Sequence, residues 1–180
     1  MKKKADWKKE IDLVTEKFKN SFCDLIEEEL NYKPKEEVWS IAQIIAHIIT
    51  LNSSYFEYFR EIQSGDHILP DIENKEVFAQ NAGERMLPFM NRDRLEHANT
   101  WDIWEPPSDP IKKDIIHDFE KSQMEFKTLI ENLGDLPLTN TYIKYPGHFD
   151  LIFKLDDCIN FLIEHENRHW NQAIEIGQHS

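Results

Sequence analysis

The sequence predicts an all-α protein built as a four-helix bundle, and three observations support this. Apolar residues recur at steps of three and four along four long segments, which is the spacing of a helix with one buried face. Proline and glycine fall near the ends of these segments, where helices stop. The chain contains only five glycines, which disfavours a turn-rich β-sandwich or barrel. Helices that are apolar on one side bury that side most simply against one another.

The first two helices have clear sequence signals. The first is expected over residues 5–31, because a proline follows shortly after that range and cannot continue a helix. The second is expected to follow Ser40, because Ser40 and Gln43 have the spacing of a capping box. It extends to about residue 64, where Gly65 can adopt the left-handed conformation that closes a helix.

The other two helices are separated from these by long connections. Residues 66–107 are expected to form a crossover between the second and third helices, with a short helix at about 75–86. The third helix is expected from Asp109 and Pro110 to the residue before Gly134. Residues 136–153 have little periodicity and are interpreted as a second connection. The fourth helix then runs from about residue 154 or 156 to residue 176.

Composition limits the class of protein and its partners. The length of 180 residues favours one domain covering residues 1–180. The net charge of −13 disfavours nucleic acid and anionic membranes as partners, because both bind clustered Lys and Arg. No secretory signal and no membrane-spanning apolar segment is found. Cys23 and Cys158 lie in expected helices and are interpreted as core residues rather than a disulfide, so we expect a cytoplasmic protein.

Three histidines lie on the apolar faces of expected helices. His165 and His169 are one helical turn apart, and a divalent ion can bridge side chains at this spacing. His47 lies on the apolar face of the second helix. Three imidazoles would give an open metal site with a position left for water or substrate. The alternative is that each histidine is a hydrogen-bonded core residue without a metal.

Residues 165–169 also match the zincin peptidase pattern, His-Glu-x-x-His, in which the glutamate is the general base. The context disfavours a peptidase, because no third ligand follows His169 at zincin spacing and no convincing strand precedes the motif. Two interpretations of Glu166 stay open, a solvated acid on the side of the helix and a catalytic role near the metal.

Aromatic residues near the crossover are candidates for a substrate pocket. Trp101 and Trp104 lie in the long connection, where loops often shape pockets, and Tyr55 lies on the second helix. The alternative for the two tryptophans is that they attach the long connection to the core.

Two motifs together resemble the DinB/YfiT-like superfamily. Residues 39–47, WSIAQIIAH, resemble the family segment in which a histidine follows a Trp-Ser helix start. Residues 165–169, HENRH, resemble its second motif, a histidine pair with an arginine before the last histidine. The resemblance implies an up-down-down-up four-helix bundle. It also implies a divalent ion, usually zinc or nickel, held by His47, His165 and His169.

The same resemblance implies several functions. Some members of the family join a low-molecular-weight thiol, such as bacillithiol or mycothiol, to an electrophile, and others are described as metal-dependent hydrolases. Members are often dimers, so a homodimer is a further expectation. We therefore expect a metal-dependent transferase that uses a low-molecular-weight thiol on a small electrophilic molecule. The alternatives are a hydrolase of a small amide or ester and a non-catalytic helical bundle that acts by association.

Overall fold

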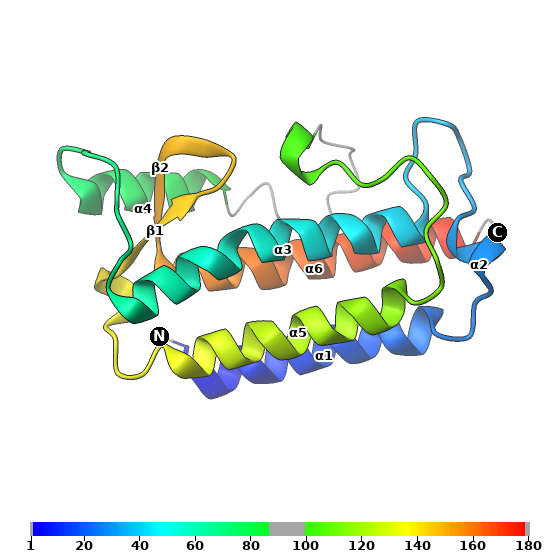
Figure 1. Cartoon of the computed structure of the whole chain (residues 1–180), viewed down its shortest axis with the longest axis horizontal. Coiled ribbons are helices and arrows are strands. Elements are labelled where there is room, and N and C mark those ends of the chain that lie inside the picture. The colour runs from blue at the N-terminus through cyan, green and yellow to red at the C-terminus, as the bar shows by residue number, and fades with distance from the viewer. Residues whose placement is uncertain (1, 87–99, 179–180) are drawn as a thin grey trace.

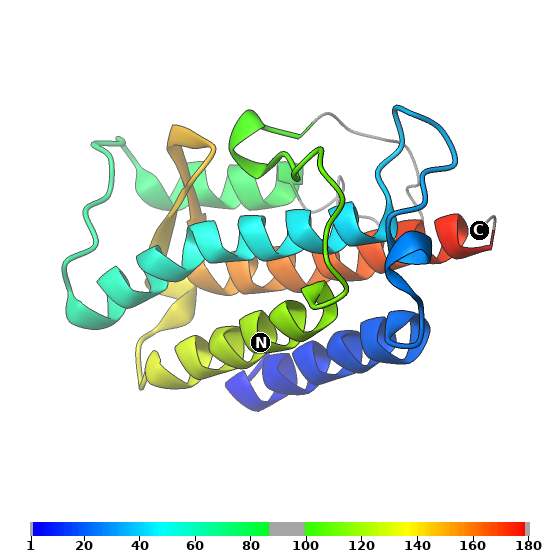
Figure 2. The same ribbon diagram turned by 45° about the vertical axis from the view of Figure 1, so that its right-hand side comes forward.

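The computed structural model describes residues 2–86 and 100–178, and in this part the protein is mostly helical with one small antiparallel sheet (Figure 1). Four long helices make up most of it: α1 (Lys4–Phe22), α3 (Ile41–Ser64), α5 (Ile115–Asn132) and α6 (Leu155–Gly177). Each packs against two others, since α1 and α3 both contact α5 and α6. Figures 1 and 2 show α1 and α6 running in one direction and α3 and α5 in the other.

The start of α3 has the capping box that its sequence predicts. The Ser40 side chain accepts a hydrogen bond from the Gln43 backbone at 3.2 Å, and the Gln43 side chain accepts one from the Ser40 backbone at 3.1 Å. The Gln43 amide also donates to the carbonyl of Pro107 at 2.8 Å, which ties the end of the crossover to this helix start. At the other end, Gly65 closes the helix with a φ of 82°. The predicted helix over 40–64 is therefore confirmed.

The first and third predicted helices are both shorter than expected. α1 ends at Phe22 and is followed by the short helix α2 (Glu27–Leu30), not by helix to residue 31. The Asn31 side chain donates to the carbonyl of Ile111 at 2.7 Å and accepts from its N–H at 2.8 Å. α5 starts at Ile115, four residues after this contact, rather than at Pro110.

Residues 136–153 connect α5 and α6, as predicted, but this connection contains a β-hairpin that was not predicted from the sequence. β1 (Tyr142–Tyr145) pairs antiparallel with β2 (His148–Lys154), and Ile143 lies opposite Phe153. Residues 142–145 alternate between half-buried and buried side chains, which is a strand signal too short to stand out in the sequence. A short 3₁₀ turn, η3 (Leu138–Asn140), precedes the hairpin.

Two described elements of the connection between α3 and α5, a helix and a 3₁₀ turn, lie on the side of α3 and α6 that faces away from α1 and α5 (Figures 1 and 2). They are α4 (Lys75–Met86), as the sequence predicts, and the 3₁₀ turn η2 (Asp102–Trp104). α4 packs against β2 and α6, while η2 packs against α3. α4, η2 and the hairpin together form a second layer over this pair of helices.

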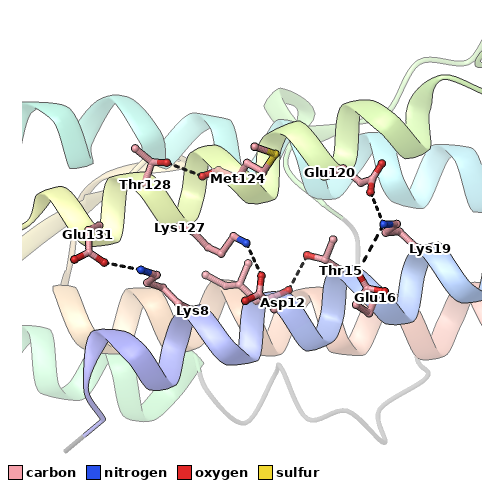
Figure 3. Close-up of polar contacts among 11 residues, drawn as sticks. Lys8, Asp12, Thr15, Glu16, Lys19, Glu120, Met124, Lys127, Thr128 and Glu131 are labelled. Atoms are coloured by element: carbon pink, nitrogen blue, oxygen red, sulfur yellow. Dashed lines mark hydrogen bonds and ion pairs between the residues drawn. The ribbon is translucent and has the colours of Figure 1, made fainter.

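On the opposite side, α1 and α5 are joined by ion pairs (Figure 3), and an apolar seam lies beneath them. Beneath the charges, the rings of Phe18 and Phe119 pack with their centroids 4.7 Å apart. The ion pairs are exposed, so solvent screens them and the apolar contact contributes most of the stability. The pairs that cross the seam are Lys8 with Glu131, Asp12 with Lys127, and Lys19 with Glu120. No helix in residues 2–86 and 100–178 is long and apolar enough to cross a membrane.

Ser40→Ala should lower the free energy of unfolding by about 1 kcal/mol, because the backbone N–H of Gln43 at the start of α3 loses its side-chain acceptor. Urea denaturation monitored by circular dichroism measures this change. Ser53→Ala, at an exposed position in the middle of the same helix, is the matched control. Equal stabilities of the two variants would contradict a stabilising role for the cap.

Candidate metal centre

The structure brings His47, His165 and His169 together in the interior. Their ligand atoms all lie within 4.8 Å of one another. The Nε2 atom of His165 lies 3.3 Å from that of His47 and 3.0 Å from that of His169. All three side chains are buried, with between 3% and 5% of each residue exposed. The two helices α3 and α6 therefore converge on one point with three nitrogen atoms.

The environment of His47 leaves its Nε2 atom available to a metal. Its Nδ1 atom lies 2.8 Å from the backbone carbonyl of Trp104 in η2, and a carbonyl only accepts hydrogen bonds. The proton of neutral His47 is therefore assigned to Nδ1, which places the lone pair on Nε2, facing the other two histidines. A hydrogen bond of this kind, from a ligand histidine to a backbone carbonyl, is the usual support of a metal-bound imidazole.

The three imidazoles are held in the neutral form that metal binding requires. The pKa of His47 is lowered to about 4, and burial is the largest cause of this shift. The hydrogen bond to the Trp104 carbonyl acts in the opposite direction. Burial is also the main cause of a pKa well below the ordinary value for His165 and His169. The positive charge of Arg168 adds to the lowering at all three. The donor set thus fits a divalent ion that accepts nitrogen ligands, zinc and nickel among them.

Aromatic rings pack around the imidazoles. The ring of Trp39 lies 4.8 Å from that of His47 and 6.4 Å from that of His169, measured between centroids. Phe161 stacks on His165 at 5.9 Å. This packing of Trp39 and Phe161 against the histidines was not predicted from the sequence. The position of Trp39 immediately before the capping box was the only available signal for it, since the side chain next to a helix start folds back along the first turns.

The three predicted pocket residues lie in different environments. Trp104 is 2% exposed and reaches the site through its carbonyl, while its indole N–H donates to the Ser54 hydroxyl at 3.1 Å. Tyr55 is fully buried, and its hydroxyl has no hydrogen-bond partner in the described part of the chain. Trp101 is 48% exposed. The role of these residues in binding substrate stays a prediction.

Glu166 is not a solvated acid, and that interpretation is wrong. It is completely buried, and its Oε1 atom accepts hydrogen bonds from the amide of Asn52 at 2.6 Å and from the amide of Gln123 at 2.9 Å. Burial raises the pKa of Glu166 to about 7, and the hydrogen bonds from the two side-chain amides act in the opposite direction. Its carboxylate does not belong to the group of ligand atoms formed by the three histidines.

Fold and site together define a class: a mostly helical protein with a buried three-histidine group, supplied by two neighbouring helices, that could hold a metal ion. The family model of the DinB superfamily matches residues 10–173. The chain therefore belongs to the DinB superfamily, as the two motifs indicated. No curated protein and no solved structure matched the chain in the same comparisons.

Replacing His47 or His169 by alanine should abolish stoichiometric metal binding, because two imidazoles remain where three are needed. The measurement is metal analysis of protein purified without a nickel column, followed by zinc titration against a chromophoric chelator. His117→Ala is the control, since its side chain is 67% exposed and lies on α5. Wild-type metal content in the His47 variant would contradict the site.

The metal-free protein should lose stability as pH falls from about 6.5 to about 4. His47 stays neutral over this range when folded but takes up a proton when unfolded, so acid favours the unfolded state. The difference between the two pKa values corresponds to about 3 kcal/mol for His47 alone. Urea denaturation across this pH range should give a flatter curve for His47→Gln, whereas His117→Gln should follow the wild type.

Proposed function

We propose that the chain is a single-domain, up-down-down-up four-helix bundle of the DinB type that acts as a metal-dependent thiol transferase. Its reaction would join a low-molecular-weight thiol to a small electrophilic molecule. The single observation that carries this proposal is the convergence of three neutral, buried imidazole nitrogens from α3 and α6. Membership of the DinB superfamily supports the same proposal.

The chemistry of the donor set suits a thiol. Three neutral ligands leave the full positive charge of a divalent ion uncompensated, and a bound zinc or nickel ion would lower the pKa of a thiol so that it is held as thiolate at neutral pH. The side chains of this chain hold and shield the site: the Trp104 carbonyl orients His47, and Trp39 and Phe161 cover the imidazole rings. Apolar surroundings exclude water, which competes with a thiol for the electrophile.

The environment of Glu166 favours a transferase over a hydrolase. A hydrolase of the zincin kind needs a carboxylate beside the metal to take a proton from water. Among the described residues, no carboxylate joins the three histidines, and Glu166 is bonded to Asn52 and Gln123 instead. A thiolate nucleophile needs no such base once it has lost its proton. The net charge of −13 favours small-molecule substrates over nucleic acid, and a homodimer remains part of the proposal.

The zinc-loaded or nickel-loaded protein should conjugate bacillithiol or a similar low-molecular-weight thiol to a chlorodinitrobenzene-type electrophile. His169→Ala should remove the activity, because the loss of one ligand abolishes metal binding. Product formation can be followed by absorbance with and without the thiol. His117→Ala serves as the control with an intact site.

A panel of small esters and amides, tested without added thiol, separates the transferase from the hydrolase. If the protein hydrolyses an ester in a metal-dependent reaction, and His169→Ala removes this activity, the result would favour the hydrolase over the proposed transferase. Conjugation no faster than in His169→Ala would reject the transferase.

A further inference from the structure

A buried cluster of three polar side chains connects three of the four long helices. Asn52 of α3, Gln123 of α5 and Glu166 of α6 are 0%, 1% and 0% exposed. Both amides donate to the same atom, Oε1 of Glu166, at 2.6 and 2.9 Å. We call these three residues the amide–carboxylate brace.

Stability does not explain the brace. Moving a carboxylate and two amides out of water is costly, and apolar side chains of similar size are often as stable or more stable in such positions. The brace is also incompletely satisfied: Oδ1 of Asn52, Oε1 of Gln123 and Oε2 of Glu166 have no hydrogen-bond partner among the described residues. An apolar triplet would therefore hold the helices together at least as strongly.

The position of the brace gives it a different role. Glu166 directly follows His165 on α6 and precedes His169 by three residues, and Asn52 follows His47 by five residues on α3. Sliding α6 along α3 by the rise of one residue would move every α6 atom by about 1.5 Å. This shift would break the hydrogen bond between Glu166 and Asn52, and it would also move the nitrogens of His165 and His169 away from that of His47.

Apolar contacts resist such a slide less strongly than a hydrogen bond does. The hydrophobic effect has no direction and depends mainly on buried area, which changes little over small shifts. Leu51 and Leu162, on α3 and α6, belong to one continuous apolar cluster of this kind. A hydrogen bond, in contrast, weakens steeply with distance and angle.

We propose that the amide–carboxylate brace is a positioning device that sets the register of α6 against α3 and α5, and so places His165 and His169 opposite His47. This inference rests on the proposed metal site, because register matters for function only if the three nitrogens must share an ion. It assigns Glu166 a positioning role that acts through the ligands rather than on substrate.

The test compares metal binding with stability in variants that remove the brace. The combined change Asn52→Leu, Gln123→Met and Glu166→Met replaces all three members, so that no buried partner is left alone. We expect the apoprotein to melt at or above the wild-type temperature, whereas cobalt(II) affinity falls by at least about tenfold. The visible spectrum of the bound cobalt should also change, because the spectrum reports the ligand geometry.

Two further variants keep the test decisive. Glu166→Gln retains an oxygen that can accept from both amides, so it should restore cobalt affinity and spectrum close to those of the wild type. Asn52→Leu alone removes the bond to α3 and keeps the bond to α5, so it should weaken cobalt binding by a smaller factor. Asn160→Leu is the matched control on α6, because it removes the 2.9 Å bond from Trp7 and should reduce stability without changing the cobalt spectrum.

Wild-type cobalt affinity and spectrum in the combined variant would overturn the proposal. A fall in cobalt affinity accompanied by an equal loss of apoprotein stability would do the same, since the brace would then be only structural. A wild-type protein that binds no cobalt would reject the metal site itself. Crystal structures of the apoproteins then test the brace separately: an Nε2 separation of His47 and His165 that grows by on the order of 1 Å in the combined variant supports it, and an unchanged separation rejects it.

Discussion

The contact between α3 and α6 is the constraint on which the rest of the structure depends. These two helices supply all three histidines, and their Nε2 atoms approach to 3.0 and 3.3 Å. Such an approach of three neutral nitrogens brings lone pairs together without enough protons to pair them, which is an arrangement that a cation stabilises. Burying the imidazoles keeps them uncharged, so that the same contact also sets their chemistry.

The second layer supplies a hydrogen bond to the histidine site that the long helices alone do not provide. The crossover brings the Trp104 carbonyl to His47, and this bond orients the ring and selects its tautomer. The crossover is itself held to α3 at the end of η2 and just after it: the Trp104 indole donates to Ser54, and the Pro107 carbonyl accepts a hydrogen bond from Gln43. A long loop between two helices, which in many bundles only connects them, is here part of the site.

Hydrogen bonds from side-chain amides connect distant segments of this fold. Asn31 bonds through both of its polar groups to the backbone of Ile111, in the segment that precedes α5. Asn52 and Gln123 hold Glu166 between three helices. These bonds have a preferred length and direction, so they determine exact positions along helices whose apolar faces alone would tolerate several.

The local signals in the sequence were sufficient for the helices and the candidate ligands. Apolar periodicity, the capping box at Ser40 and the stop at Gly65 are interactions within a few residues, so they predicted α3 closely. The i, i+4 spacing of His165 and His169 is equally local. The burial of Glu166 and the carbonyl partner of His47 were decided by tertiary structure. Each depends on a contact between residues far apart in the chain, and one sequence carries no pattern that reveals which partner a lone amide or carbonyl will meet.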